Sequence, residues 1–173
     1  MNKRIGNFVD HVDTEERKFP RWIRLLTLRR AMIVPISTPL IHQAVRHPAV
    51  CPWVSADETF TWKPDPRYFA LGAFDGDEYL GCFLFEIRNR RLVEAHVALL
   101  PTAWGARAKR AGIEAIEWIF GNTGFERIHA AVCVRNRSAL AYVERIGMRP
   151  WGKALRSSSK GEDQIFFGID KEA

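Results

Sequence analysis

Apolar positions recur along the chain at two spacings, and their order predicts an α/β domain. Strand-length apolar runs fall at residues 28–36, 68–74, 79–87, 91–100, 127–134, 148–155 and 164–169. Apolar residues three and four positions apart, the spacing of one helix face, fall at residues 38–46, 108–121 and 136–147. The expected order is strand, helix, long loop, three strands, helix, strand, helix and two strands.

Turn and cap residues separate these elements. Thr38-Pro39 is expected to cap and start the first helix, Asn136 to open the last one and Gly147 to close it. Asp75-Gly76-Asp77 and Asn89-Arg90 predict tight hairpin turns, so the three middle strands form an antiparallel meander. The strand that follows the second helix then belongs to a β-helix-β crossover, which pairs strands in parallel.

Two segments fall outside this pattern. Residues 1–27 mix charged and apolar side chains and are expected to form an N-terminal extension, part helix and part arm, before one domain at residues 28–173. Residues 47–67 are expected to form a long loop. Their aromatic side chains either line a binding pocket or pin the loop to the sheet. The aromatic residues are Trp53, Phe60 and Trp62, with Asp57 and Glu58 as acidic neighbours that would attract an ammonium group.

Composition changes the picture little. The chain is 47% hydrophobic and 27% charged, which is typical of a folded protein rather than a disordered one. No apolar run reaches the roughly 18 residues of a membrane span, and residues 1–30 lack a secretory core. Cys51, Cys82 and Cys133 have no metal-ligand spacing, which fits a reducing compartment. We expect a cytoplasmic protein with no membrane or metal partner.

Charge adds one feature. The formal net charge is +6, and residues 101–160 hold eleven Lys/Arg against four Glu. Such a basic region faces nucleic acid or a small polyanion, or is simply solvated. No recognition helix or stacking platform accompanies it, so nucleic acid ranks last among these partners.

Two sequence patterns resemble those of a known family. Residues 93–108 read VEAHVALLPTAWGARA, and residues 136–148 read NRSALAYVERIGM. Over residues 28–170 the chain resembles the GNAT superfamily of acetyl-CoA-dependent acyltransferases. The likeness is nearest to the branch that acetylates ribosomal-protein N-termini, with a weaker likeness to phage-encoded GNAT-like proteins. The resemblance implies a GNAT fold, a mixed sheet of about six to seven strands with a central splay and helices on both faces.

The first pattern predicts a cofactor site. A strand, a loop and a helix start follow one another, and a helix N-terminus favours phosphate oxygens. By resemblance the segment binds acetyl-CoA, through the strand backbone at the pantetheine arm and through the loop at the pyrophosphate. The implied residues are Val97, Ala98, Leu99, Trp104, Gly105, Ala106, Arg107, Ala108 and Asn136. Of the family's Gln/Arg-x-x-Gly-x-Gly/Ala positions only Gly105 fits, and Arg107 either pairs with a phosphate or obstructs it.

Candidate catalytic residues lie beside this site. Amine acetylation needs a base for the ammonium group and an acid for the leaving thiolate. Glu94 and His96 share one strand face. Glu94 matches the carboxylate that several family members use as base, and His96 titrates near neutrality; otherwise both are ordinary sheet and cleft-wall residues. The family's acidic tyrosine falls at Val143, and Tyr142 lies about 100° away around the helix, so it is either the acid or a packing residue.

Cys133 stands close to the expected thioester. It is either a structural thiol, the preferred interpretation, or a covalent acyl carrier, which would require a depressed pKa.

The resemblance implies an N-acyltransferase that moves an acetyl group from acetyl-CoA to a primary amine of a small molecule or peptide, by direct attack in a ternary complex. The alternative is a GNAT-fold protein without catalysis that serves as a binding or structural module, such as a phage assembly or virion component. The atypical loop and the absent tyrosine favour that alternative. In either case the N-terminal extension would contact a second copy or an assembly partner, or only its own domain.

Overall fold

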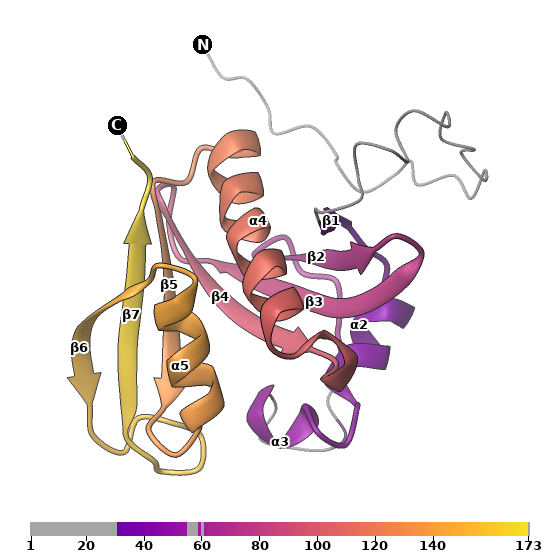
Figure 1. Cartoon of the computed structure of the whole chain (residues 1–173). Helices are drawn as coiled ribbons and strands as arrows, with labels where there is room; N and C mark the ends of the chain where they lie inside the picture. Colours follow the sequence, from indigo (N-terminus) through magenta and orange to yellow (C-terminus); the bar gives the residue numbers. More distant parts are fainter. Residues whose placement is uncertain (1–30, 55–58, 60, 173) are drawn as a thin grey trace.

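One mixed sheet organises the protein. The computed structural model describes residues 31–54, 59 and 61–172, so the expected extension at residues 1–27, with Asp57, Glu58 and Phe60, lies outside the described residues. Seven strands follow the order β1-β2-β3-β4-β5-β7-β6 (Figure 1). β4 and β5 run parallel, and every other neighbouring pair is antiparallel.

The predicted strands and the three longer helices are all present. The strands are β1 (Met32–Pro35), β2 (Tyr68–Asp75), β3 (Glu78–Ile87), β4 (Leu92–Leu99), β5 (Arg127–Cys133), β6 (Arg149–Ala154) and β7 (Gln164–Asp170). The helices are α2 (Thr38–Val45), α3 (Cys51–Val54), the 3₁₀ turn η1 (Pro101–Ala103), α4 (Ala106–Asn122) and α5 (Arg137–Arg145). α3 falls within the segment expected to be a loop, and none of the described helices is long and apolar enough to cross a membrane.

Helix caps agree with the sequence at α5 and differ at α2. The side chain of Asn136 accepts a hydrogen bond from the Ala139 N–H at 3.0 Å, as expected of an N-cap. Gly147 closes the helix with a φ of +93°, a conformation that favours glycine. At α2 the predicted cap was wrong by one residue, because Ser37 has the extended backbone of an N-cap and Thr38 is the first helical residue.

Two further boundaries differ from the prediction. α4 continues past Gly121 and ends at Asn122, where Thr123 turns to extended backbone and its hydroxyl donates to the Ile119 carbonyl at 2.7 Å. The two-residue turn at Asn89-Arg90 was wrong. Residues 88–91 form the connection, because the Asn89 side chain accepts hydrogen bonds from two backbone N–H groups, at 2.8 and 3.0 Å.

The side chains of the sheet pack into two cores, one on each face. α4 and α5 cover one face and pack with strand residues such as Phe85, Val93 and Leu99. α2 covers the other face and packs with Leu84 and Ala98. Since neighbouring side chains on a strand point to opposite faces, the even-numbered residues of β4 lie on the α2 face.

The sheet opens in its middle, as the predicted central splay requires. β4 and β5 pair over only three positions, Leu92–Arg127, Val93–Ile128 and Glu94–His129. Beyond them the two strands separate, and Figure 1 shows the gap between them. This opening positions the candidate site.

Candidate functional site

A cleft of about 440 Å³ occupies the opening between β4 and β5. Its walls come from both faces of the sheet. On the α5 side they include Ala130, Val132, Asn136, Ala139, Tyr142 and Val143; on the α2 side they include Trp53, Glu94, His96, Cys133, Lys160 and Glu162. The cleft therefore has lining residues on both faces of the sheet.

The backbone of β4 presents unused hydrogen-bonding groups to this cleft. The Leu100 N–H donates to the Leu80 carbonyl at 2.9 Å, and antiparallel residues alternate between bonded and non-bonded pairs. The continuous register from Gly81–Leu99 to Ile87–Val93 then directs the N–H and C=O groups of Ala95, Val97 and Leu99 toward β5. The parallel pair Glu94–His129 uses the Ala95 N–H, and Trp104 uses the Leu99 carbonyl. The Ala95 carbonyl and both backbone groups of Val97 then have no partner strand among the described residues.

The loop before α4 is held open by its own contacts. The Trp104 indole N–H donates to the Leu99 carbonyl at 3.0 Å. Gly105 has a φ of +89°, and a Cβ placed there would meet nothing within 4 Å. As the N-cap residue it supplies no side-chain hydrogen bond to the helix that starts at Ala106. The N-terminal N–H groups of a 17-residue helix, including those of Ala106, Arg107 and Ala108, are suited to phosphate oxygens.

Arg107 adopts an arrangement that the sequence did not anticipate. Its guanidinium pairs with Asp75 at 3.0 Å and with Glu78 at 2.7 Å, both at the β2–β3 turn. It also donates to the Thr102 carbonyl at 3.1 Å, which ties the two ends of the loop together. The side chain is therefore engaged with the protein itself.

Glu94 is the centre of an ion-pair cluster on the α2 face. Its Oε2 accepts hydrogen bonds from Arg88 Nε at 2.7 Å and from Arg88 Nη2, and His129 Nε2 lies 3.1 Å from the same oxygen. Arg88 Nη1 also donates to Glu86 at 2.9 Å. His96 Nε2 lies 3.8 Å from the other oxygen, Oε1.

The pKa values of the two candidate bases are both lowered, but for different reasons. Burial alone would raise the pKa of Glu94, but the hydrogen bonds from His129 and Arg88 outweigh it and lower this pKa to about 2. Desolvation by the cleft walls lowers the pKa of His96, and the charge of Glu94 opposes that shift only in part. The Glu94 side chain is 9% exposed, whereas that of His96 is 44% exposed to the open cleft.

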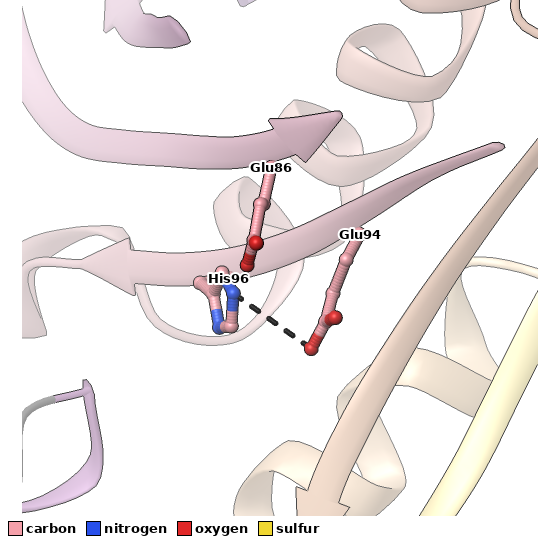
Figure 2. A group of neighbouring side chains, drawn as sticks. All are labelled: Glu86, Glu94 and His96. Atoms are coloured by element: carbon pink, nitrogen blue, oxygen red, sulfur yellow. Dashed lines mark ion pairs between the residues drawn. The ribbon is translucent and has the colours of Figure 1, made fainter. Parts of the chain in front are cut away.

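Figure 2 shows Glu86, Glu94 and His96 pointing toward one another from β3 and β4. Their ligand atoms lie within 4.8 Å of one another, a spacing short enough for a metal ion. Arg88, however, donates to both carboxylates. We therefore interpret the group as an ion-pair cluster in which the chain's own guanidinium bridges the two carboxylates.

Tyr142 and Val143 lie on the α5 wall. Val143 is buried in the core. The hydroxyl oxygen of Tyr142 is buried, has no hydrogen-bond partner among the described residues and sits against Gly112 of α4, where an added Cβ would lie 2.2 Å from it. Burial raises the pKa of Tyr142 above its ordinary value, so the phenol is a hydrogen-bond donor at neutral pH.

Cys133 and the loop aromatics complete the site on the α2 side. The Cys133 thiol donates to Glu162 at 2.7 Å, and desolvation together with this carboxylate raises the pKa of the thiol. Trp53 lines the cleft and is 54% exposed. Trp62 instead packs against the core edge-on to Tyr68. Trp62 thus follows the interpretation in which an aromatic side chain pins the loop to the sheet, and the acceptor-pocket role of Trp53 stays a prediction.

Sequence reasoning missed three residues of the cluster, Glu86, Arg88 and His129. Glu86 stands directly opposite Glu94 on β3, and like charges at such positions repel unless a cation lies between them. The two-residue turn expected at Asn89-Arg90 would have placed Glu86 opposite Val93, so the pair follows only from the observed register. His129 reaches Glu94 only through the parallel pairing, which no local pattern encodes.

A splayed mixed sheet, a cleft through the splay and a loop leading into a helix N-terminus together define the acetyltransferase class of α/β folds. A family model described as the acetyltransferase (GNAT) family matches residues 40–148. The chain belongs to this family, whose enzymes take their acetyl group from acetyl-CoA.

Several solved structures share the fold. The chain is similar to spermidine N-acetyltransferase from Vibrio cholerae in complex with CoA and spermine (TM-score 0.69, 14% identity, covering 82% of this chain and 95% of that one). It is also similar to ribosomal-protein-S5-alanine acetyltransferase from Vibrio fischeri (TM-score 0.61, 16% identity, covering 82% of this chain and 93% of that one). A third similar structure is a probable GNAT acetyltransferase from Chromobacterium violaceum (TM-score 0.62, 16% identity, covering 82% of this chain and 83% of that one). No curated protein matches the chain in sequence.

These comparisons confirm the expected GNAT fold and the likeness to the ribosomal-protein branch at the level of fold. None of the three structures is a phage protein, so that weaker likeness stays a prediction. The site residues fit the family's cosubstrate. The open backbone edge of β4 and the N-terminus of α4, which Gly105 leaves without a side-chain cap, each offer it hydrogen-bonding groups.

Proposed function

We propose that this protein is an N-acyltransferase that acetylates a primary amine by direct attack within a ternary complex. The observation that carries the proposal is the cleft that passes through the sheet at the splay, with walls from both faces. Two reactants that enter from opposite faces meet between β4 and β5. Holding both at once converts a bimolecular reaction into an effectively unimolecular one.

The α5 side would hold acetyl-CoA, which supplies a thioester carbonyl for attack. The gap-facing backbone of Val97 and Ala95 would bond the pantetheine arm, as a neighbouring strand would. Leu99 contributes less, because its carbonyl already accepts from Trp104. Ala98, next along β4, supports this edge from the α2-face core.

The phosphates and the arm have further partners in this proposal. The N–H groups of Gly105, Ala106 and Ala108 would face the pyrophosphate, and Asn136 would contact the arm beside its role as helix cap. Arg107, held by Asp75 and Glu78, leaves the loop backbone open and stiff. Tyr142 would donate its partnerless hydroxyl to the bound cosubstrate.

The α2 side would receive the acceptor amine. His96 and Glu94 handle its proton, and Trp53 lines the approach. The similar proteins include a spermidine N-acetyltransferase and a ribosomal-protein-S5-alanine acetyltransferase, so a small polyamine and an alanine-led peptide are the first acceptors to try.

Two measurements test this function. Acetyl-CoA at 100 times its Kd is expected to stabilise the fold by about 2.7 kcal/mol, seen as a rise in melting temperature. Thiol release with spermidine, butylamine and an alanine-led peptide then tests transfer, with Cys133→Ala as control. Intersecting initial-velocity plots and an unchanged rate in Cys133→Ala are expected for direct transfer; parallel plots would indicate an acyl-enzyme.

The alternative of a GNAT-fold module without catalysis predicts the opposite. Val143 in place of the family's tyrosine and an Arg107 paired within the protein are the observations that favour it. No thermal shift with millimolar acetyl-CoA would support this alternative and overturn the proposed transfer.

A further inference from the structure

The geometry points to a division of labour in the cluster around Glu94: Arg88 and His129 act as positioning residues that hold Glu94 as a fixed carboxylate facing His96, and His96 alone takes the proton from the amine. This inference rests on the proposed function. It gives His96 the role of base, which the family resemblance gives to Glu94.

The two oxygens of Glu94 have different surroundings. Oε2 accepts hydrogen bonds from Nε and Nη2 of Arg88 and lies 3.1 Å from His129 Nε2. An oxygen that already accepts these hydrogen bonds has little capacity for a further proton. Oε1 is directed at His96, 3.8 Å away, a distance for ion pairing rather than for a direct hydrogen bond.

Access separates the two candidates in the same way. The Glu94 side chain is 9% exposed and His96 is 44% exposed, so an amine in the cleft reaches the imidazole first. The groups that face His96 are Glu94, Glu86, Arg88 and His129, two anions and one permanent cation beside a second imidazole. Their arrangement allows the ring to be neutral before reaction and supports its positive charge afterwards.

The step balances without any further reactant. His96 Nε2 takes one proton from the ammonium group, and the freed nitrogen lone pair attacks the thioester carbonyl. The N–C bond forms and the C–S bond breaks. The second proton of the nitrogen goes to the departing thiolate, and His96 returns its proton to solvent. Glu94 keeps its charge throughout and stabilises the imidazolium, so it never needs to be protonated.

The first test measures the pKa of His96 by NMR in the full chain, without any acceptor. The chain has five histidines, and His96→Gln assigns the signal. Glu94→Gln is expected to lower the pKa of His96 by about 1, because a unit charge 3.8 Å away contributes about that much even at the dielectric constant of water. Arg88→Met is expected to raise it, since a cation is lost.

Arg91→Met is the matched control. It removes a cation from the same turn, but Arg91 pairs with Glu126 and is 77% exposed, so the pKa of His96 should stay unchanged. Shifts of opposite sign in Glu94→Gln and Arg88→Met support the positioning role. A general loosening of the fold would not produce them. No shift in either variant would overturn it.

The second test is the pH profile of thiol release with whichever amine the wild type acetylates. His96→Gln is expected to lower kcat by 100-fold or more and to remove the rising limb. Glu94→Gln should keep that limb and move it to lower pH. The reverse pattern would make Glu94 the base and overturn the inference. If the wild type acetylates no amine, the proposed function and the base role fail, and the NMR titration still decides whether Arg88 and Glu94 set the charge state of His96.

Discussion

Replacing Tyr142 by Phe should make the ligand-free protein more stable. The hydroxyl of Tyr142 is buried and has no hydrogen-bond partner among the described residues. A buried polar group without a partner costs about 1–3 kcal/mol, and the ring itself keeps its contacts in the variant. We expect a gain of about 1 kcal/mol, which for a chain of 173 residues raises the melting temperature by about 2–4 °C.

Tyr79→Phe is the matched control with the opposite sign. The Tyr79 hydroxyl donates to the Leu40 carbonyl at 2.9 Å. Its removal deletes this hydrogen bond, so we expect a loss of about 1 kcal/mol. Urea denaturation at pH 7 measures both variants under the same conditions, and the two tyrosines should move the midpoint in opposite directions.

Ligand binding gives the second half of this prediction. If Tyr142 donates to the bound cosubstrate, Tyr142→Phe loses about 1 kcal/mol of binding, or about fivefold in the Kd of CoA by calorimetry. A variant that is less stable than wild type without ligand would show that the hydroxyl has a partner. A stabilised variant with an unchanged Kd would show that the hydroxyl takes no part in binding.

Three further outcomes follow from the backbone and from Glu94. Gly81→Ala should destabilise the protein by about 3 kcal/mol or more in urea, because its Cβ would lie 2.3 Å from the Ala98 carbonyl at a φ of +121°; Gly76→Ala, with φ +62° and nothing within 4 Å, should cost only about 1–2 kcal/mol. Gly105→Ala should weaken CoA binding about tenfold or more by calorimetry with a smaller loss of stability, since its Cβ meets nothing and only the φ of +89° is strained; an unchanged Kd would separate the loop from the cofactor. The pKa of Glu94, lowered from 4.5 to about 2, contributes on the order of 3 kcal/mol that is present above pH 4.5 and lost as the pH falls toward 2. Urea midpoints between pH 2 and 7 should therefore show a flatter acid limb for Glu94→Gln, and parallel limbs would contradict the lowered pKa.

The sequence predicted the helices and strands because each has its own apolar periodicity and its own cap or turn residues at its ends. Asn136 and Gly147 act within a few residues of the helix that they delimit, so a local pattern identifies them. The shared strand face of Glu94 and His96 was predicted for the same reason, since their spacing is two; their catalytic roles, which the family resemblance suggested for Glu94, stay a prediction.

Residues whose partners lie far along the chain could not be found in this way. His129 is 35 residues from Glu94 and meets it only because β5 pairs in one particular register. Arg107 is joined to Asp75, 32 residues earlier, and no phosphate-loop pattern reports that partner. The length of the turn at residues 88–91 decides where Arg88 points, and a two-residue turn was expected there.

The short β4–β5 ladder has a mechanical consequence. Three residue pairs of the ladder join the half-sheet of β1–β4 to that of β5–β7. Further contacts across the boundary come from α4 with α5 and from the backbone N–H groups of Glu126 and Arg127, which donate to the Arg91 carbonyl. We therefore expect the two half-sheets, called here the two plates, to behave as separate cooperative units in hydrogen exchange. A ligand bonded to both plates would slow amide exchange across the whole sheet, far beyond the residues that it touches. The connection at residues 123–126, between α4 and β5, is then the natural place to divide the chain into two complementing fragments.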